Sequence, residues 1–238
     1  QSYDCKGKSV LIYDFGGGTF DLAFVKFDAN GDHITLTPMG DKKCGGEDID
    51  RILYDEWDKV AMRDSQRHVC EIEGKLDAPF LKRCMRIKES LCEHFKKNTQ
   101  RTMVEKVAGK ARSMTITKDQ WNSLISPIVD KTIVLTKQTL ALIEKEHYTI
   151  DSVILIGGSS KIPLVRESLL QILPVAPQPV QDYDIAVSKG AAIFVNQDMV
   201  QEKKCYCRKD GTQMTTRMKY CRQCGTLNFK YDYRFETI

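Results

Sequence analysis

Apolar residues recur along the chain at two different periods, which predict strands near both ends of the main domain and helices between them. Short apolar runs at 10–13, 20–27 and 152–156 have the length of buried strands. Residues 33–36 alternate between polar and apolar, which predicts a third strand of an N-terminal meander. Asn30-Gly31 lies between the second and third strands and is a hairpin signal, because both turn positions need positive φ.

Helical spacing of apolar residues predicts helices over 49–60, 79–95, 117–146 and 163–173. Thr117 and Gln120 have the spacing of a capping box, which places the start of the third helix. Pro127 lies inside that helix and predicts a division into two, because proline lacks the N–H that the helix needs. A final helix is expected to open near Asp182.

Composition is that of a globular protein with a genuine core. The chain has 238 residues, of which 42% are hydrophobic, and no apolar run approaches the ~20 residues that cross a bilayer. Residues 1–7 lack the apolar stretch of a signal peptide, and the absence of an initiator Met suggests a piece of something longer. Five scattered cysteines are typical of reduced thiols, so we expect a cytoplasmic protein without membrane contact.

Positive charge is concentrated in the C-terminal tail. Residues 200–238 contain nine Lys or Arg and four Asp or Glu, a net charge of +5. A solvated charged surface would explain this, and so would a docking site for an acidic partner or for nucleic acid. We expect a protein partner at this tail and not nucleic acid.

Four cysteines in the tail, Cys205, Cys207, Cys221 and Cys224, form two close pairs separated by a loop. Two thiolate pairs at this spacing favour a tetrahedral structural Zn²⁺ site, although the first pair is one residue tighter than usual. Reduced thiols on a β-hairpin and disulfides are the alternatives.

Glycine turns follow two of the apolar strands. Asp14 to Asp21 contains three consecutive glycines and Thr19, and Gly157-Gly158-Ser159-Ser160 follows the later strand. Such turns let backbone N–H groups approach an anion, although a tight turn is the better explanation of a single Gly-Gly pair. Two carboxylates beside a phosphate site suit hydrated Mg²⁺ and an oriented water. The spacing fits neither a Walker loop nor a dinucleotide fingerprint.

Five segments, in order, resemble the DnaK-type 70-kDa heat-shock protein family within the actin-like ATPase superfamily, over about residues 8–199. They are Val10 to Asp21, Gly40-Asp41 with Gly45 to Asp48, Arg86 to Leu91, Gly157 to Pro163, and Asp184 with Gly190 to Ala192.

The resemblance implies a role for each matching residue. It assigns catalysis to Asp14, Thr19 and Asp21, with Asp14 also holding Mg²⁺ through water. It assigns ATP or ADP contacts to Gly16, Gly17, Gly18, Gly46, Lys88, Gly157, Gly158, Ser159, Lys161 and Asp184.

The chain departs from the family around the expected adenine site. Two stacking arginines of the family are Glu89 and Lys161 here, and Cys92 and Met85 replace a serine and a glutamate. A carboxylate cannot stack on a base as guanidinium does, so we expect adenine binding weaker by about 1–3 kcal/mol.

The predicted fold is α/β: one actin-like ATPase (ribonuclease H-like) lobe over 1–199, with a mainly helical subdomain inserted at about 46–117. A small zinc-ribbon-like tail over 200–238 follows. We expect an ATP-driven conformational switch that partners a first lobe absent from this chain, with hydrolysis left to the full-length protein. A nucleotide-gated scaffold that docks a partner through the tail is the first alternative, and a sugar kinase is the second.

Overall fold

The computed structural model describes residues 6–29, 33–36, 38–69, 78–178, 188, 204–206, 209, 212–215, 220 and 222–224. The chain forms two compact units, 1–184 and 185–238, which we describe separately. Within the described residues, no helix combines the length and the apolar character needed to cross a membrane.

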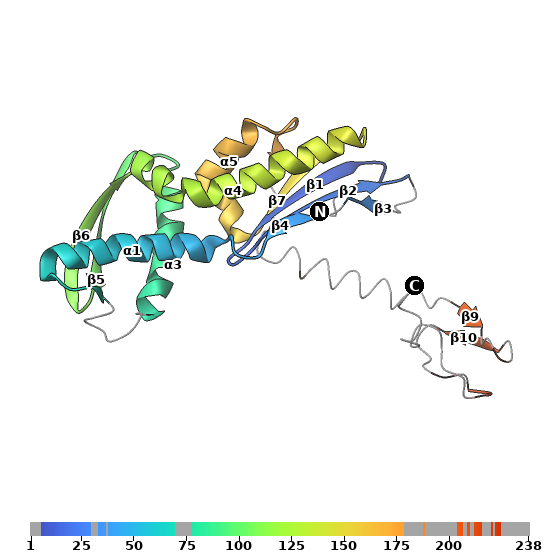
Figure 1. Ribbon diagram of the computed structural model, residues 1–238, viewed down its shortest axis with the longest axis horizontal. Coiled ribbons are helices and arrows are strands. Elements are labelled where there is room, and N and C mark those ends of the chain that lie inside the picture. The colour runs from blue at the N-terminus through green and yellow to red at the C-terminus, as the bar shows by residue number, and fades with distance from the viewer. Residues whose placement is uncertain are drawn as a thin grey trace. The chain divides into compact units, whose positions relative to one another are not determined.

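A mixed sheet is the framework of the first unit (Figure 1). Its centre is β1 (Ser9–Phe15), which pairs antiparallel with β2 (Phe20–Phe27) and parallel with β7 (Ser152–Ile156). β3 (His33–Thr35) and β4 (Met39–Asp41) pair with β2, and β8 (Pro177–Gln178) pairs with β7. The three predicted strands of the meander and the later strand are therefore present, whereas Asn30-Gly31 lies outside the described residues.

The long helix α4 (Lys118–Lys145) and the short helix α5 (Pro163–Leu170) lie along this sheet (Figure 1). The buried Tyr13 hydroxyl donates a 2.6 Å hydrogen bond to the Thr132 hydroxyl, which ties β1 to α4. The predicted capping box at the start of α4 is confirmed, because Gln120 N donates to the Thr117 hydroxyl and Thr117 N donates to the Gln120 side chain.

The prediction that Pro127 divides this helix is wrong, since α4 runs through it. Proline cannot donate to the carbonyl of Ser123, one turn earlier. The Ser126 hydroxyl donates to that carbonyl at 3.2 Å instead. The carbonyl therefore keeps a partner, and packing of the apolar face holds the two halves in one helix.

The inserted part, between β4 and α4, contains α1 (Gly46–Ser65), α3 (Ala78–His94) and a hairpin of β5 (Gln100–Val107) and β6 (Lys110–Thr117). Helices make up most of the described insertion, as predicted, and the β5–β6 hairpin is an addition that the sequence did not indicate. Ala108 and Gly109 both have positive φ, as a two-residue hairpin turn requires. Most side chains of both strands are exposed or half-buried, which weakens the apolar alternation that would have revealed them.

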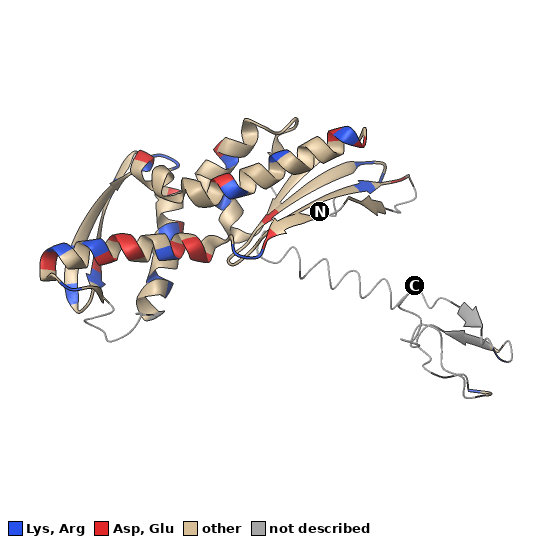
Figure 2. Ribbon diagram, viewed as in Figure 1, with Lys and Arg blue, Asp and Glu red and all other residues tan. Residues whose placement is uncertain are grey.

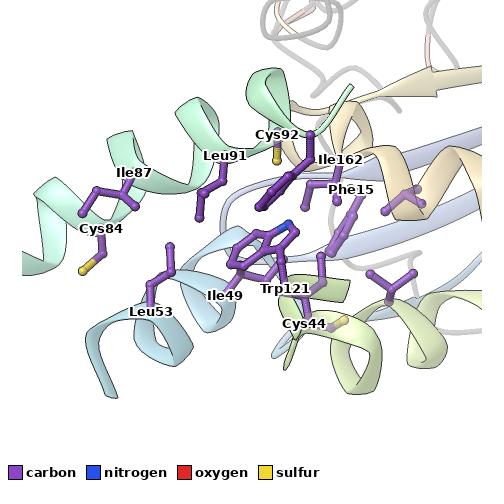
Figure 3. Packing of buried hydrophobic residues seen from close by; sticks show 14 of the residues in the cluster. Phe15, Cys44, Ile49, Leu53, Cys84, Ile87, Leu91, Cys92, Trp121 and Ile162 are labelled. Atoms are coloured by element: carbon purple, nitrogen blue, oxygen red, sulfur yellow. The ribbon is translucent and has the colours of Figure 1, made fainter. Parts of the chain in front are cut away.

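One apolar cluster joins the insertion to the sheet. Figure 3 shows Ile49 and Leu53 of α1, Leu91 of α3 and Trp121 of α4 directed into the same interior as Phe15. The insertion is thus packed onto the end of the sheet where β1 leads into its glycine turn.

In the second unit the structure describes a short antiparallel hairpin of β9 (Lys204–Tyr206) and β10 (Gln213–Thr215). Asp184 and the predicted closing helix lie outside the described residues, apart from Ser188, which is helical.

Candidate functional site

The glycine turn between β1 and β2 is an exposed loop with a defined backbone. Gly16 N donates to Thr19 O at 3.0 Å, which closes the turn. Gly17 and Gly18 are exposed, and a Cβ at either would meet no atom within 4 Å. The space beside the loop can therefore admit the oxygens of a phosphate group.

The two carboxylates at the base of this loop face each other across the hairpin. Asp14 of β1 is the register partner of Asp21 of β2. The Thr19 hydroxyl donates to the Asp21 carboxylate at 3.1 Å. Burial raises the pKa of Asp14, and the neighbouring charge of Asp21 raises it further. Like charges held together in this way favour a bound cation, and carboxylate oxygens are what Mg²⁺ prefers.

The first turn of α1 holds the loop from behind. Gly46 N donates to Gly16 O at 3.1 Å, and Glu47 N donates to Gly17 O at 2.7 Å. A Cβ at Gly45 would lie 2.3 Å from Gly17 O, so only glycine permits this close approach. These helix N–H groups bind loop carbonyls, so the start of α1 positions the loop and is not itself an exposed anion site.

The segment after β7 holds the loop from the other side. Gly158–Lys161 forms a 3₁₀ turn, and the buried Ser159 hydroxyl donates to Gly16 O at 2.8 Å. Gly157 has φ +79°, and a Cβ there would lie 2.4 Å from Phe15 O. The two predicted glycine turns therefore lie against each other, although they are far apart in the sequence.

Lys88 of α3 reaches the same place through a buried ion pair. Its Nζ lies 2.8 Å from the Asp50 carboxylate of α1 and donates to Gly46 O at 2.8 Å. Burial raises the pKa of Asp50, and the hydrogen bond from Lys88 opposes that increase. The structure thus gives Lys88 protein partners. Direct contact with a nucleotide stays a prediction.

A cavity of about 430 Å³ adjoins the loop. It is lined by Gly17, Met85, Lys88, Glu89, Cys92, Glu93, Gly158, Ser159, Lys161 and Ile162. The four positions that depart from the family, Met85, Glu89, Cys92 and Lys161, all lie in this lining. Burial raises the pKa of the Cys92 thiol to about 11, so this thiol is an uncharged part of the cavity wall at physiological pH.

The structure brings together most of the residues predicted for the site, and Asp184 lies outside the part it describes. The sequence-based prediction missed Asp50, Glu93 and Ile162. Asp50 carried one usable signal, a carboxylate between the buried Ile49 and Leu53 of an apolar helix face. A buried carboxylate calls for a cationic partner.

For zinc, the described residues give no support. They contain no group of three or more residues able to hold a metal ion. Cys205 lies in β9 opposite Met214, and Cys224 is half-buried in a turn. Cys207 and Cys221 lie outside the described residues, so the four-cysteine site stays a prediction.

Comparison with known proteins agrees with this geometry. A family model described as "Hsp70 protein" matches residues 2–202. The chain is 32% identical over 194 residues to a "Chaperone protein HscA homolog" of Shewanella sp. (strain ANA-3), and 31% identical over 191 residues to the homolog of Shewanella putrefaciens. Each match covers 80% of this chain and 29% of the relative. The chain thus spans under a third of the length of these relatives, and it belongs to the Hsp70 family.

Proposed function

We propose that the first unit is a lobe that binds the phosphates of ATP or ADP with Mg²⁺, and that nucleotide turnover switches the conformation of the full-length protein. The observation that carries this proposal is the pair Asp14 and Asp21 flanking an exposed glycine loop. Membership of the Hsp70 family supports it. We include chaperone activity of the full-length protein in the proposal, because the relatives are named chaperone proteins.

The loop and its supports have separate tasks in this proposal. Gly16 to Gly18 and Thr19 would contact the phosphates, and Asp14 would hold Mg²⁺ through water. Bound Mg²⁺ would neutralise phosphate charge and favour the ionised form of Asp14. Asp21, fixed by Thr19, would orient a water molecule toward the terminal phosphate. Because Gly16 O and Gly17 O are already bound by α1 and Ser159, the loop is preorganised for this contact.

The base would enter the cavity beside the loop, against α3 and the 158–161 turn. Glu89 and Lys161 line that cavity, and neither offers the planar cation that stacks on adenine. We therefore propose nucleotide recognition that depends more on phosphate than on base.

The remaining parts of the proposal rest on the sequence. They are a lobe over 1–199 with an insertion at 46–117, a tail over 200–238 that holds Zn²⁺ and meets a protein partner, and a first lobe that closes over the nucleotide. We also propose a cytoplasmic location, because Cys44 and Cys92 are buried free thiols. A scaffold gated by nucleotide remains the alternative function.

Titration calorimetry of the 238-residue chain with Mg-ADP tests phosphate binding. We expect binding by the natural chain and loss of binding in Gly17→Val, because the new side chain fills the space that phosphate needs. Thermal stability should not change, since nothing lies within 4 Å of a Cβ at Gly17. Ser113→Ala on the exposed face of β6 is the control and should bind normally. Equal Mg-ADP binding by Gly17→Val would refute the assignment of the loop.

A second titration tests the base cavity. Replacing Glu89 and Lys161 together with arginine should tighten Mg-ADP binding by about 10- to 100-fold, the equivalent of about 1–3 kcal/mol. Mg-GDP is the comparison ligand. An unchanged affinity for Mg-ADP would show that other groups hold the base.

A further inference from the structure

A second cavity, of about 510 Å³, lies between α3 and β5 on a different face of α3 from the nucleotide cavity. It is lined by Arg83, Arg86, Ile87, Ser90, Arg101, Thr102, Met103, Val104 and Glu105. The α3 residues recur at helical spacing and form one stripe. None of these residues lines the cavity beside the glycine loop.

The lining contains three arginines, and protein contacts hold two of them in defined positions. Arg101 donates from Nη1 to the Ser90 carbonyl and to the Ser90 hydroxyl, both at 2.7 Å. Arg83 donates from Nη2 to the Lys106 carbonyl at 2.9 Å, and its guanidinium lies 4.8 Å from the centre of the Phe80 ring. These contacts use only part of each guanidinium, which has five N–H donors.

The positive charge of the cavity is not neutralised by the protein itself. Within the part of the chain that the structure describes, Arg83, Arg86 and Arg101 form no ion pair. Glu105 is the one acidic side chain in the lining, so the cavity has a net charge of +2. The Arg83 Nε is buried and has no hydrogen-bond partner. On α1, by contrast, basic and acidic residues alternate, as the blue and red segments in Figure 2 show.

The wall opposite α3 is the edge of a strand. Five consecutive residues of β5, 101–105, line the cavity, so residues of both faces of the strand contribute through side-chain or backbone atoms. A cavity with this lining runs along the edge of the strand and not over one face. Among the described strands β5 pairs with β6 alone, so its other edge has no strand partner. His94 and Arg83 donate to the Gln100 and Lys106 carbonyls at the two ends of that edge, and the backbone groups of Thr102 and Val104 lie between them.

Apolar groups lie between the arginines. Ile87 and Met103 form part of the floor, and Val104 is 66% exposed. A small inorganic anion would use the guanidinium groups but neither the strand edge nor these apolar side chains. An extended peptide would use all three.

We propose that this groove binds an extended acidic segment of a partner protein, which pairs with the outer edge of β5 and places its carboxylates against Arg86 and Arg101. Arginine binds carboxylates through two parallel hydrogen bonds, and strand addition supplies the backbone contacts. This proposal does not depend on nucleotide binding.

Fluorescence anisotropy with a dye-labelled octapeptide of alternating glutamate and threonine tests the proposal on the 238-residue chain. We expect saturable binding that weakens as salt is raised, and no binding of the lysine–threonine counterpart. Arg86→Glu should weaken binding at least about tenfold, since it replaces a charge-assisted bond with repulsion. Arg86 is exposed, so circular dichroism should show an unchanged fold.

Two controls separate this site from general charge attraction. Arg166→Glu makes the same change of charge on an exposed position of α5 and should leave binding intact. A glutamate–threonine peptide with alternate N-methylated amides keeps the charge but cannot extend the sheet, and should bind at least about tenfold more weakly. Absence of binding, equal loss in Arg166→Glu, equal binding of the methylated peptide, or displacement by low concentrations of inorganic phosphate would each overturn the proposal.

Discussion

The buried pair of Lys88 and Asp50 gives a quantitative test of how the site is held together. The side chain of Lys88 is 11% exposed and that of Asp50 is 8% exposed, with 2.8 Å between the charged atoms. Removing one partner from such a pair leaves an uncompensated buried charge, which costs about 3–5 kcal/mol. We therefore expect Lys88→Met and Asp50→Asn each to lower the free energy of unfolding by about that amount. The double variant should lose clearly less than the sum.

The measurement is urea unfolding of the natural chain, both single variants and the double variant. Lys96 and Glu93 provide the matched control, because they form an ion pair with side chains 48% and 71% exposed. Their coupling energy should be only ~0.3–0.5 kcal/mol.

The cost of Lys88→Met should also depend on pH. Burial raises the pKa of Asp50, and loss of Lys88 removes the group that opposes the increase. A carboxyl whose pKa is higher in the folded state destabilises that state as pH rises through the raised pKa. Lys88→Met should therefore be less damaging at pH 5 than at pH 8. A coupling no larger than that of the surface pair, together with a pH-independent cost, would refute this account of the pair.

Three further predictions concern the loop and the framework. Gly45→Ala should weaken Mg-ADP binding at least about tenfold, because the new Cβ would lie 2.3 Å from Gly17 O and must displace the loop. An affinity for Mg-ADP equal to that of the natural chain, measured by calorimetry, would contradict this prediction. Asp14→Asn should raise the stability of the nucleotide-free chain at pH 7 by ~0.2–1 kcal/mol, since it removes a like-charge pair across two strands. Burial, and then the charge of Asp21, raise the pKa of Asp14 in the folded state, so the natural chain should lose stability as pH rises above the usual aspartate range, and the variant should not. Parallel dependence of the unfolding free energy on pH from pH 4 to pH 8 in the two proteins would argue against a raised pKa of Asp14. Thr117→Ala should lower the free energy of unfolding by about 0.5–2 kcal/mol, measured by urea unfolding, because it removes the cap of α4. Thr117→Ser keeps the hydroxyl and should lower it little. An equal loss in both variants would exclude capping as the cause.

The glycine loop between β1 and β2 could be predicted because its signals are local. A short apolar run, three glycines and two aspartates are adjacent in the chain, and each has one dominant physical explanation. The same kind of local pattern predicted the two strands that flank the loop, the cap of α4 and the helical period of α1. The structure contains all of them.

Features that depend on distant partners could not be predicted in this way. The link from Ser159 to Gly16 and the pairing of Lys88 with Asp50 exist only because β7, α1 and α3 meet at the end of β1. The β5–β6 hairpin is mostly exposed, so its apolar pattern was too weak to identify. The prediction at Pro127 was wrong because the Ser126 hydroxyl donates to the Ser123 carbonyl, a bond that the proline nitrogen cannot make.

Helix α3 forms a wall of both cavities, one beside the glycine loop and one along β5. Two binding sites that share a rigid wall are thermodynamically linked whenever a ligand at either one moves or stiffens that wall. The factor by which occupancy of the first site changes affinity at the second must then equal the factor in the reverse direction. If both proposed ligands bind, a single helix turn, from Arg86 to Ser90, would carry this reciprocal effect, and partner binding and nucleotide affinity would each report on the other.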